Sequence, residues 1–485
     1  MADTEPALDI ARHLKYWKMC LQHPLPNHYL SNEGNRVALA YFIINSIAIL
    51  TPPPAGDADP PQTKPLIPAA DRPRLRQWVL SHQHPGGGFA ASSSLVFPLQ
   101  GYEPWEPETG AAQDVEGPGL ANLPATVFAL HLLALLADEG DGAGAFRGVD
   151  RVQLLRWLRR LQRADGSFGE VLKRLPGRGW FIGGGNDMRY CYIAASVRWM
   201  LRGDLEEGQV GWVEDFDTDA LARYILMTQT YDGGFAGSSQ EEPHAGYAYC
   251  AISALSLLDR PLETTTTTPS HHSTTLRSGI RNLPGLLHWL TSRQFTYLDP
   301  DSPLAARDAP SSPDDDNDDD DNDDPINFLL PVHPGALAPP AARRHVACNG
   351  RANKVADTCY TWWVGASLIG LGAPQLVDWP AARRFLLDRM AHRIGGFSKY
   401  PGGPPDVYHG CFGLTALAVM GEAGLHAVDA ALAVPVGTVR VIEKARAALV
   451  RRDRGRGAGL VSGAVALGVA MRGREPGWLR AVERG

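Results

Sequence analysis

An aspartate, a cysteine and a histidine are the residues of this sequence best suited to bind a metal ion. Asp357 and Cys359 lie two positions apart, and His409 follows far downstream. Carboxylate oxygen, thiolate sulfur and imidazole nitrogen all bind Zn²⁺, and three protein ligands leave a fourth position open for catalysis. The spacing equally fits a capping aspartate, a buried cysteine and an unrelated histidine. From spacing alone, both interpretations stay open.

Basic residues immediately precede this aspartate, in the stretch NGRANKVADTCY. Arg351 offers a planar fork and Lys354 a point charge, a combination suited to phosphate. We expect Tyr360 and His244 to join them. A solvated basic loop would give the same pattern, so the phosphate site is a hypothesis at this point.

Four apolar segments begin with an acidic residue that is closely followed by a polar one. The pairs are Asp187 with Arg189, Glu242 with His244, Asp357 with Cys359, and Asp406 with His409. An acidic residue at a helix start caps free N–H groups and suits the helix dipole. In a ring of antiparallel helix pairs all inner helices run the same way, so these starts should meet at one rim. Such a rim also attracts phosphate.

A repeated pattern supports this arrangement. Amphipathic segments alternate with apolar ones, and glycine-rich turns ending at Phe89, Phe168, Phe235 and Phe397 separate them. A glutamine stands six residues before each of the first three phenylalanines. The apolar segments are hydrophobic on most faces and should be buried on most sides; they begin at Asn122, Asp187, His244, Asp357 and His409. The pattern predicts an all-α fold of stacked helix pairs, closed into an α/α toroid, or barrel.

Composition bounds the class of protein. The chain has 485 residues, 44% of them hydrophobic, and its net charge of -7 comes from nine aspartates between positions 314 and 324. No basic stripe suggests nucleic-acid binding. The six cysteines follow no disulfide spacing, which indicates a reducing compartment. With no signal peptide and no membrane span apparent, we expect a cytoplasmic protein. We predict a catalytic toroid over 10–440, a disordered acidic insert at 299–343 and an arginine-rich tail at 441–485.

Four long motifs give the sequence a family resemblance. They are GNDMRYCYIAASVRWML, YDGGFAGSSQEEPHAGYAYCAISAL, NGRANKVADTCYTWWVGASL and GGFSKYPGGPPDVYHGCFGL. From Arg12 to about Ala430 the chain resembles the β subunits of protein prenyltransferases. The resemblance implies the α/α toroid, and it implies site residues by position. These are zinc ligands Asp357, Cys359 and His409; diphosphate-binding residues His244, Arg351, Lys354 and Tyr360; lipid-tunnel residues Tyr192, Tyr247, Cys250 and Trp363; and Arg189, which would hold the peptide carboxylate through water.

Two further positions distinguish branches of the family. Lys399 stands where farnesyltransferases carry an aspartate that helps to bind Mg²⁺, so Mg²⁺ is not expected to be required. Ala38, with Tyr41 and Phe42 nearby, stands where farnesyltransferases close the tunnel with tryptophan. Both positions resemble type I geranylgeranyltransferases. Two departures from the family pattern are Ala245, where glycine is usual, and Asn122, where a histidine near the peptide carboxylate is common.

The resemblance implies a heterodimer with a helical-repeat α subunit. The substrates would be geranylgeranyl diphosphate and C-terminal CaaX proteins ending in Leu or Phe, such as Rho-family small GTPases. Three alternatives remain. A farnesyltransferase β subunit is the nearest, and a non-catalytic helical-repeat scaffold is a different class. A terpene cyclase would need an acidic motif inside the cavity, and the only aspartate run lies in the predicted insert.

Overall fold

A computed structural model describes residues 5–50, 66–95, 120–137, 140, 142–175, 179–263, 273–297, 329–331 and 344–471. For 174, 175, 179, 329–331 and 456–471 it describes the backbone alone. The predicted acidic insert at 299–343, with its aspartate run, lies outside the described residues except for 329–331.

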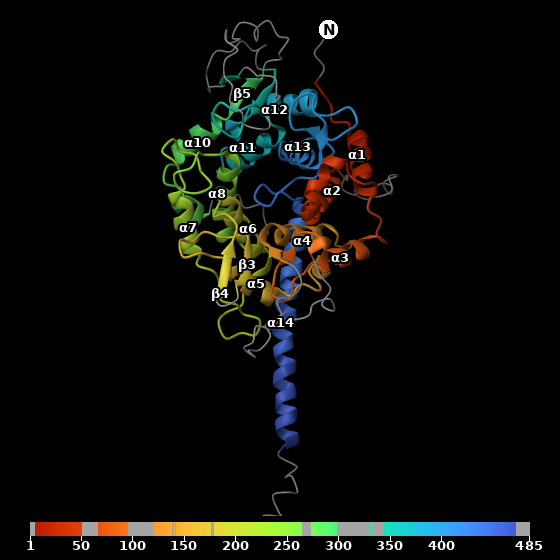
Figure 1. Cartoon of the computed structure of the whole chain (residues 1–485), viewed down its shortest axis with the longest axis vertical. Helices are drawn as coiled ribbons and strands as arrows, with labels where there is room; N and C mark the ends of the chain where they lie inside the picture. The colour runs from red at the N-terminus through yellow and green to blue at the C-terminus, as the bar shows by residue number, and fades with distance from the viewer. Residues whose placement is uncertain are drawn as a thin grey trace, which may run out of the picture.

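In the described part of the chain, six inner helices form a closed ring (Figure 1). Each packs against the next, and the last contacts the first. All six are apolar around most of their circumference, as expected for helices buried on both sides. They are α2 (Arg36–Leu50), α4 (Leu123–Leu135), α6 (Met188–Leu201), α8 (Ala245–Leu258), α11 (Thr358–Gly370) and α13 (Val407–Val419). The predicted toroid is confirmed. The helix that the repeat pattern did not include is α2.

Six outer helices within the described residues form the second layer. Most keep a polar face toward solvent, and five of them contact the inner helix that follows in sequence. They are α1 (Ile10–Gln22), α3 (Arg72–Leu80), α5 (Arg151–Arg160), α7 (Thr218–Met227), α10 (Leu283–Thr291) and α12 (Trp379–Phe385). Further helical segments lie between these elements: η1 (Asn27–Asn35), η2 (Ser93–Leu95), η4 (Gly142–Gly144), α9 (Thr274–Ser278), η8 (Pro374–Leu376) and η9 (Leu386–Met390).

The repeated glutamines join one helix pair to the next. The Gln162 side chain accepts a hydrogen bond from the N–H of Asp217 at 2.8 Å and donates to its carbonyl at 2.7 Å. Asp217 is the N-cap of α7. Gln83 and Gln229 likewise accept from the N-cap residues of α5 and α10. Gln294, a fourth member, does the same for α12. The glutamine therefore fixes where each next outer helix begins.

The glycine-rich turns also lie against the following outer helix. At Gly166 φ is +92°, and an added Cβ would lie 2.2 Å from the carbonyl oxygen of Ala220 in α7. At Gly395 φ is +95°, and a Cβ would lie 2.5 Å from the carbonyl oxygen of Arg12 in α1. Only glycine tolerates both conditions. The last turn thus packs on the first helix, which closes the outer layer.

Three small antiparallel sheets accompany the helices among the residues that the structure describes. One has the order β1 (Phe89–Ala90), β2 (Ala121–Asn122), β3 (Val171–Leu175) and β4 (Gly179–Gly183). In the second, β5 (Gln294–Tyr297) lies between β6 (Leu329–Pro331) and β7 (Val346–Cys348). The third pairs β8 (Phe397–Ser398) with β9 (Pro405–Asp406). The described part of the predicted insert is thus a strand, with Leu330 opposite Thr296.

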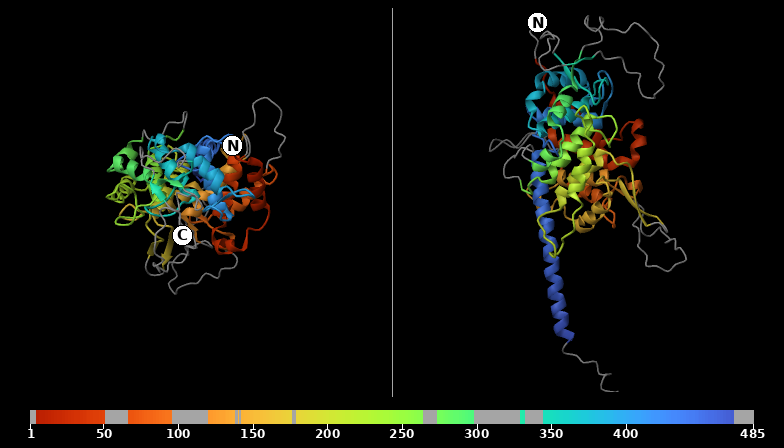
Figure 2. Two further views of the ribbon diagram at one scale, coloured as in Figure 1. Left: turned by 90° about the horizontal axis from the view of Figure 1, so that it is seen from above. Right: turned by 90° about the vertical axis from the view of Figure 1, so that its left-hand side faces the viewer.

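A single long helix, α14 (Val436–Met471), ends the described chain and leaves the globular part (Figure 2). Its first turns pack against α4, α6 and η4, and Ile442, Ala445 and Leu449 are buried. The predicted boundary between residues 440 and 441 falls inside this helix. Among the described residues, no helix has the length and apolar character needed to cross a membrane.

Candidate metal and diphosphate site

Capping aspartates position Cys359 and His409 at the starts of α11 and α13. The Asp357 side chain accepts a hydrogen bond from the Cys359 N–H at 2.8 Å. Asp406 accepts from the His409 N–H at the same distance. Each cap holds its helix start at the rim, as the sequence predicted. The two aspartates thus fix the first turns that carry the cysteine and the histidine.

Asp357, Cys359 and His409 come together at this rim. One potential ligand atom from each lies within 4.8 Å of the others. The Nε2 atom of His409 is 3.2 Å from the Asp357 carboxylate. Asp357 and Cys359 are only 8% and 4% exposed. Sequence spacing alone did not decide whether these three residues form one site, and the fold brings them together.

The electrostatics of the cluster fit a bound cation. Burial raises the pKa of the Cys359 thiol well above its usual value, and the neighbouring Asp357 raises it further. Burial lowers the pKa of His409, but hydrogen bonds to Asp357 and Asp406 outweigh it and bring it to about 9. Without a metal, protonated His409 therefore balances the negative charge of the Asp357 and Asp406 carboxylates. A divalent ion would take over that role and favour the thiolate, and the O, S and N donors suit Zn²⁺.

Asp406 is a site residue that sequence reasoning treated only as a helix cap. Its Oδ2 atom lies 2.6 Å from His409 Nδ1. This bond holds the imidazole ring so that Nε2 faces Asp357. Carboxylates commonly orient metal-binding histidines in this way. The available signal was the aspartate three positions before the histidine in the same motif.

His244 and Tyr360 form a second polar pair beside the cluster. His244 is the N-cap of α8 and accepts from the Gly246 N–H at 3.0 Å through Nδ1. The bonding pattern therefore puts its proton on Nε2, which donates to the Tyr360 hydroxyl at 3.0 Å. Burial, then Arg351, lowers the pKa of His244 to about 4. The expected cap, Glu242, instead pairs with Arg351 at 3.0 Å.

The predicted cations approach the same rim from two loops. The loop after β7 is tied to α8 because the Ala245 N–H donates to the Gly350 carbonyl at 2.9 Å. Arg351 and Lys354 follow on this loop. Lys399 follows β8, and its carbonyl accepts from the Thr358 N–H at 3.1 Å at the start of α11. The side chains of both lysines are exposed and form no ion pair with a described residue.

Arg189 and Asn122 lie at the starts of neighbouring inner helices. Asp187, the N-cap of α6, binds the Arg189 guanidinium through both carboxylate oxygens, at 2.9 and 2.8 Å. The Arg189 side chain is still 63% exposed. Its charge helps to lower the pKa of His244. Asn122 caps α4 by accepting from the Ala125 N–H at 2.7 Å.

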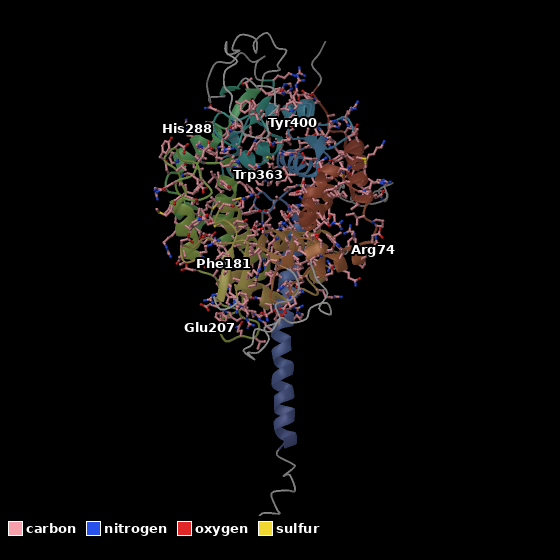
Figure 3. The ribbon with its side chains drawn as sticks, viewed as in Figure 1. Arg74, Phe181, Glu207, His288, Trp363 and Tyr400 are labelled. Atoms are coloured by element: carbon pink, nitrogen blue, oxygen red, sulfur yellow. The ribbon has the colours of Figure 1, made fainter. Side chains whose placement is uncertain are left out.

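Aromatic side chains of several inner helices contact one another inside the ring, and Trp363 lies near its middle in Figure 3. The Trp363 ring centroid is 4.5 Å from that of Phe412 and 4.9 Å from that of Tyr249. Tyr41 stacks on Phe128 at 4.8 Å. The remaining residues predicted for the tunnel lie on the same inner helices: Ala38 and Phe42 on α2, Tyr192 on α6, and Tyr247 and Cys250 on α8. Phe128, Tyr249 and Phe412 were not predicted, because core packing explains any single aromatic residue equally well.

Comparison with known proteins identifies the family. The prenyltransferase α-α toroid domain matches residues 8–434. The geranylgeranyl transferase type-1 subunit β of Arabidopsis thaliana is 30% identical over 88% of each chain. The protein farnesyltransferase subunit β of Pyricularia oryzae is 25% identical over 85% of this chain and 63% of its own. The solved Candida albicans protein geranylgeranyltransferase-I complexed with GGPP shares the fold, with a TM-score of 0.64 at 22% identity over 91% of this chain and 99% of that one. This chain therefore belongs to the prenyltransferase α-α toroid family.

Proposed function

We propose that this chain is the catalytic β subunit of a zinc-dependent type I protein geranylgeranyltransferase. It would transfer geranylgeranyl from geranylgeranyl diphosphate to the cysteine of a C-terminal CaaX sequence, working with an α subunit in the cytoplasm. The observation that carries the proposal is the cluster of Asp357, Cys359 and His409 at the starts of two inner helices of the ring. The similarity to a plant type-1 β subunit supports the same branch.

Asp357, Cys359 and His409 would hold the zinc ion. When bound, zinc supplies a fourth coordination position at which an acceptor thiol ionises near neutral pH. Asp406 keeps the His409 imidazole oriented through its 2.6 Å hydrogen bond. The buried carboxylate of Asp357 limits the net positive charge of the site.

Cationic and hydroxyl groups of the same rim would receive the diphosphate. The neutral His244 and Tyr360 offer hydrogen-bond donors, and Arg351, Lys354 and Lys399 offer positive charge. These groups stabilise the negative charge that develops on the leaving diphosphate as the carbon–oxygen bond breaks and the carbon–sulfur bond forms. Lys399 would supply a fixed ammonium where farnesyltransferases rely on Mg²⁺, so no Mg²⁺ requirement is expected.

Recognition of the two substrates would involve separate surfaces. The lipid would lie among Ala38, Tyr41, Phe42, Tyr192, Tyr247, Cys250 and Trp363. Arg189, held at the start of α6, would bind the C-terminal carboxylate of the acceptor through water. The acceptors would include Rho-family small GTPases, which end in suitable sequences. Residues 10–440 would form the catalytic unit, with 299–343 as an acidic insert and 441–485 as a basic tail.

Co-expression with a prenyltransferase α subunit tests this proposal. Peptides with CaaX ends in Leu or Ser would be assayed with geranylgeranyl and farnesyl diphosphate, with and without Mg²⁺. We expect preference for Leu and geranylgeranyl, without a need for Mg²⁺. A preference for farnesyl would instead support the farnesyltransferase alternative, and a purified protein without zinc or turnover would support a scaffold.

Ala38→Trp provides a sharper test of the branch. Ala38 lies in the first turn of α2 and is partly buried against the aromatic core. A tryptophan there would occupy volume that the last isoprene unit needs. We expect the ratio of kcat/KM for farnesyl over geranylgeranyl diphosphate to rise roughly tenfold or more. Ala38→Ser, which adds little volume, serves as the control and should leave the ratio unchanged.

A further inference from the structure

The segment between α13 and α14 reaches into the ring. Residues 428–435, here termed the closing turn, form a narrow reversal in which Val428 pairs with Pro435. The Asp429 N–H donates to the Val434 carbonyl, and the Ala433 N–H donates to the Asp429 carbonyl, both at 2.9 Å. In Figure 1 the blue chain between the two helices crosses the middle of the ring. The small side chains of this turn allow its backbone to approach the inner helices closely.

Four side chains from three inner helices bind the carbonyls at the tip of the closing turn. Two bonds end on Ala431 and two on Ala433. The donors are the hydroxyls of Tyr192 and Tyr249, at 2.8 and 3.1 Å from the Ala431 oxygen, and the Tyr41 hydroxyl and Asn45 amide, at 3.0 and 2.9 Å from the Ala433 oxygen. Tyr41 and Tyr192 are also residues assigned to the lipid tunnel. The turn is therefore bonded directly to the wall of that tunnel.

One ion pair fixes the closing turn to the end of α8. Arg260 Nη2 lies 2.6 Å from Asp429 Oδ2, and Nη1 lies 3.1 Å from Oδ1. The same carboxylate accepts from the Ala431 and Leu432 N–H groups, each at 3.0 Å. The Arg260 guanidinium in turn lies 4.6 Å from the Trp199 ring centre on α6. A single carboxylate thus shapes the turn and ties it to the ring.

We propose that the closing turn is the stop that limits isoprenoid length, and that the Asp429–Arg260 pair is the latch that fixes its position. The proposal rests on the proposed function and adds the structural element that sets the maximum length of the isoprenoid chain. A lipid longer than the available depth would have to displace the hydrogen bonds to Ala431 and Ala433. That would leave buried hydroxyl, amide and carbonyl groups unpaired, which is strongly unfavourable. Arg260 is a positioning residue, because it acts through the turn.

The test uses the heterodimer with its α subunit and one CaaX peptide. kcat/KM is measured for farnesyl, geranylgeranyl and geranylfarnesyl diphosphate in wild type, Arg260→Met and Asp429→Asn. The asparagine keeps an oxygen for the Ala431 and Leu432 N–H groups, so the turn can still form while the charge is lost. We expect the geranylfarnesyl-to-geranylgeranyl ratio to rise roughly tenfold in both variants. The farnesyl-to-geranylgeranyl ratio should stay unchanged, since the shorter lipid ends before the stop.

Arg383→Met is the matched control. It breaks the Arg383–Glu422 ion pair, in which Nη2 and Oε1 are 2.9 Å apart, outside the closing turn. Each ratio is measured within one preparation and does not depend on the folded fraction. An unchanged long-lipid ratio in both latch variants overturns the proposal, as does an equal shift in the control. Failure of the proposed function would look different, because the wild type would transfer none of the three lipids.

Discussion

The two ends of the helical ring use the same kinds of charged residue in opposite ways. At the end where α14 packs, the buried Arg151 donates to the Leu201 and Gly211 carbonyls at 2.6 and 2.8 Å and pairs with Asp453 at 3.3 Å. The positive charge of Arg151 is therefore neutralised by groups of the protein itself. At the rim, Lys354 and Lys399 are exposed and pair with no described residue. A positive charge is thus neutralised by the protein in one region, and two positive charges are left exposed in the other.

This difference separates stabilising charges from functional ones. A buried cation that is hydrogen-bonded to carbonyls and a carboxylate holds helices together, and removing its partner leaves it unpaired. An unpaired group beside helix starts, with a buried carboxylate and thiol next to it, is arranged for a ligand. Substitutions at the rim should therefore change activity with little effect on folding. Substitutions at the α14 end should do the reverse.

Cys359→Ala should have the largest effect on activity. Loss of the thiolate ligand should lower transfer by roughly a thousandfold or more and remove stoichiometric zinc, while the heterodimer still assembles. Cys191→Ala, at another buried cysteine near the start of α6, is the control and should retain both zinc and transfer. Metal analysis and single-turnover assays check this. A Cys359→Ala enzyme that turns over normally would break the distinction between the two ends.

Tyr360→Phe should have the next largest effect. It removes the hydroxyl that His244 binds at 3.0 Å, and we expect kcat to fall roughly a hundredfold if that hydroxyl donates to the leaving diphosphate. Zinc content should not change. Tyr190→Phe, which removes a hydroxyl bonded to Glu170 at 3.0 Å, should leave kcat near the wild-type value. Equal losses in the two variants would show that the hydroxyl is structural.

Asp406→Asn should weaken metal binding without abolishing it. The amide can still cap α13 through its oxygen but loses the charge that supports His409. Zinc affinity should fall about tenfold to a hundredfold, as is common for carboxylates behind a metal-bound histidine. Competition with a chelator measures this loss. An unchanged affinity would mean that Asp406 acts only as a helix cap.

His131→Phe should change stability by an amount that depends on pH. His131 on α4 is 2% exposed, neither ring nitrogen has a hydrogen-bond partner in the described structure, and burial lowers its pKa to about 4. In the unfolded chain His131 becomes protonated as the pH falls below about 6.5. In the folded chain it stays neutral until about pH 4. The histidine therefore costs stability as pH falls, by about 2 kcal/mol at pH 5.

Unfolding of wild type and His131→Phe is compared at pH 8 and pH 5. The variant should gain stability over wild type on moving to pH 5, while pH 8 supplies the reference at which both are neutral. A constant difference at the two pH values would contradict a neutral buried histidine.

The sequence predicted the toroid and the rim because both depend on local patterns. Asp187, Asp357 and Asp406 each mark the start of an apolar helix, because aspartate is a favoured N-cap residue. The inner helices run parallel, so these starts lie at the same end of the ring. The same reasoning gave Glu242 as a cap, which was wrong, since His244 caps α8 and Glu242 pairs with Arg351. Glu242 and His244 lie two positions apart and either could accept the capping hydrogen bond. Tertiary contacts decide which of them does so.

The closing turn was not predicted, for a physical reason. Its contacts join Asp429 to Arg260 and the Ala431 carbonyl to Tyr192, which are far apart in the chain. The stretch of small residues around them has no periodicity that marks a buried position. The aromatic residues Phe128, Tyr249 and Phe412 were missed similarly, because any apolar helix carries some aromatics. Local sequence shows which face is apolar, but not which cavity it lines.

Cobalt substitution tests the central claim most directly, because it reports the metal and the thiolate in one spectrum. The heterodimer loaded with Co²⁺ should show a thiolate-to-cobalt charge-transfer absorption that grows when a CaaX peptide is added. The band of the free enzyme should disappear in Cys359→Ser. If the band is absent from wild type, or persists in Cys359→Ser, then Asp357, Cys359 and His409 do not hold the metal and the proposed chemistry is wrong.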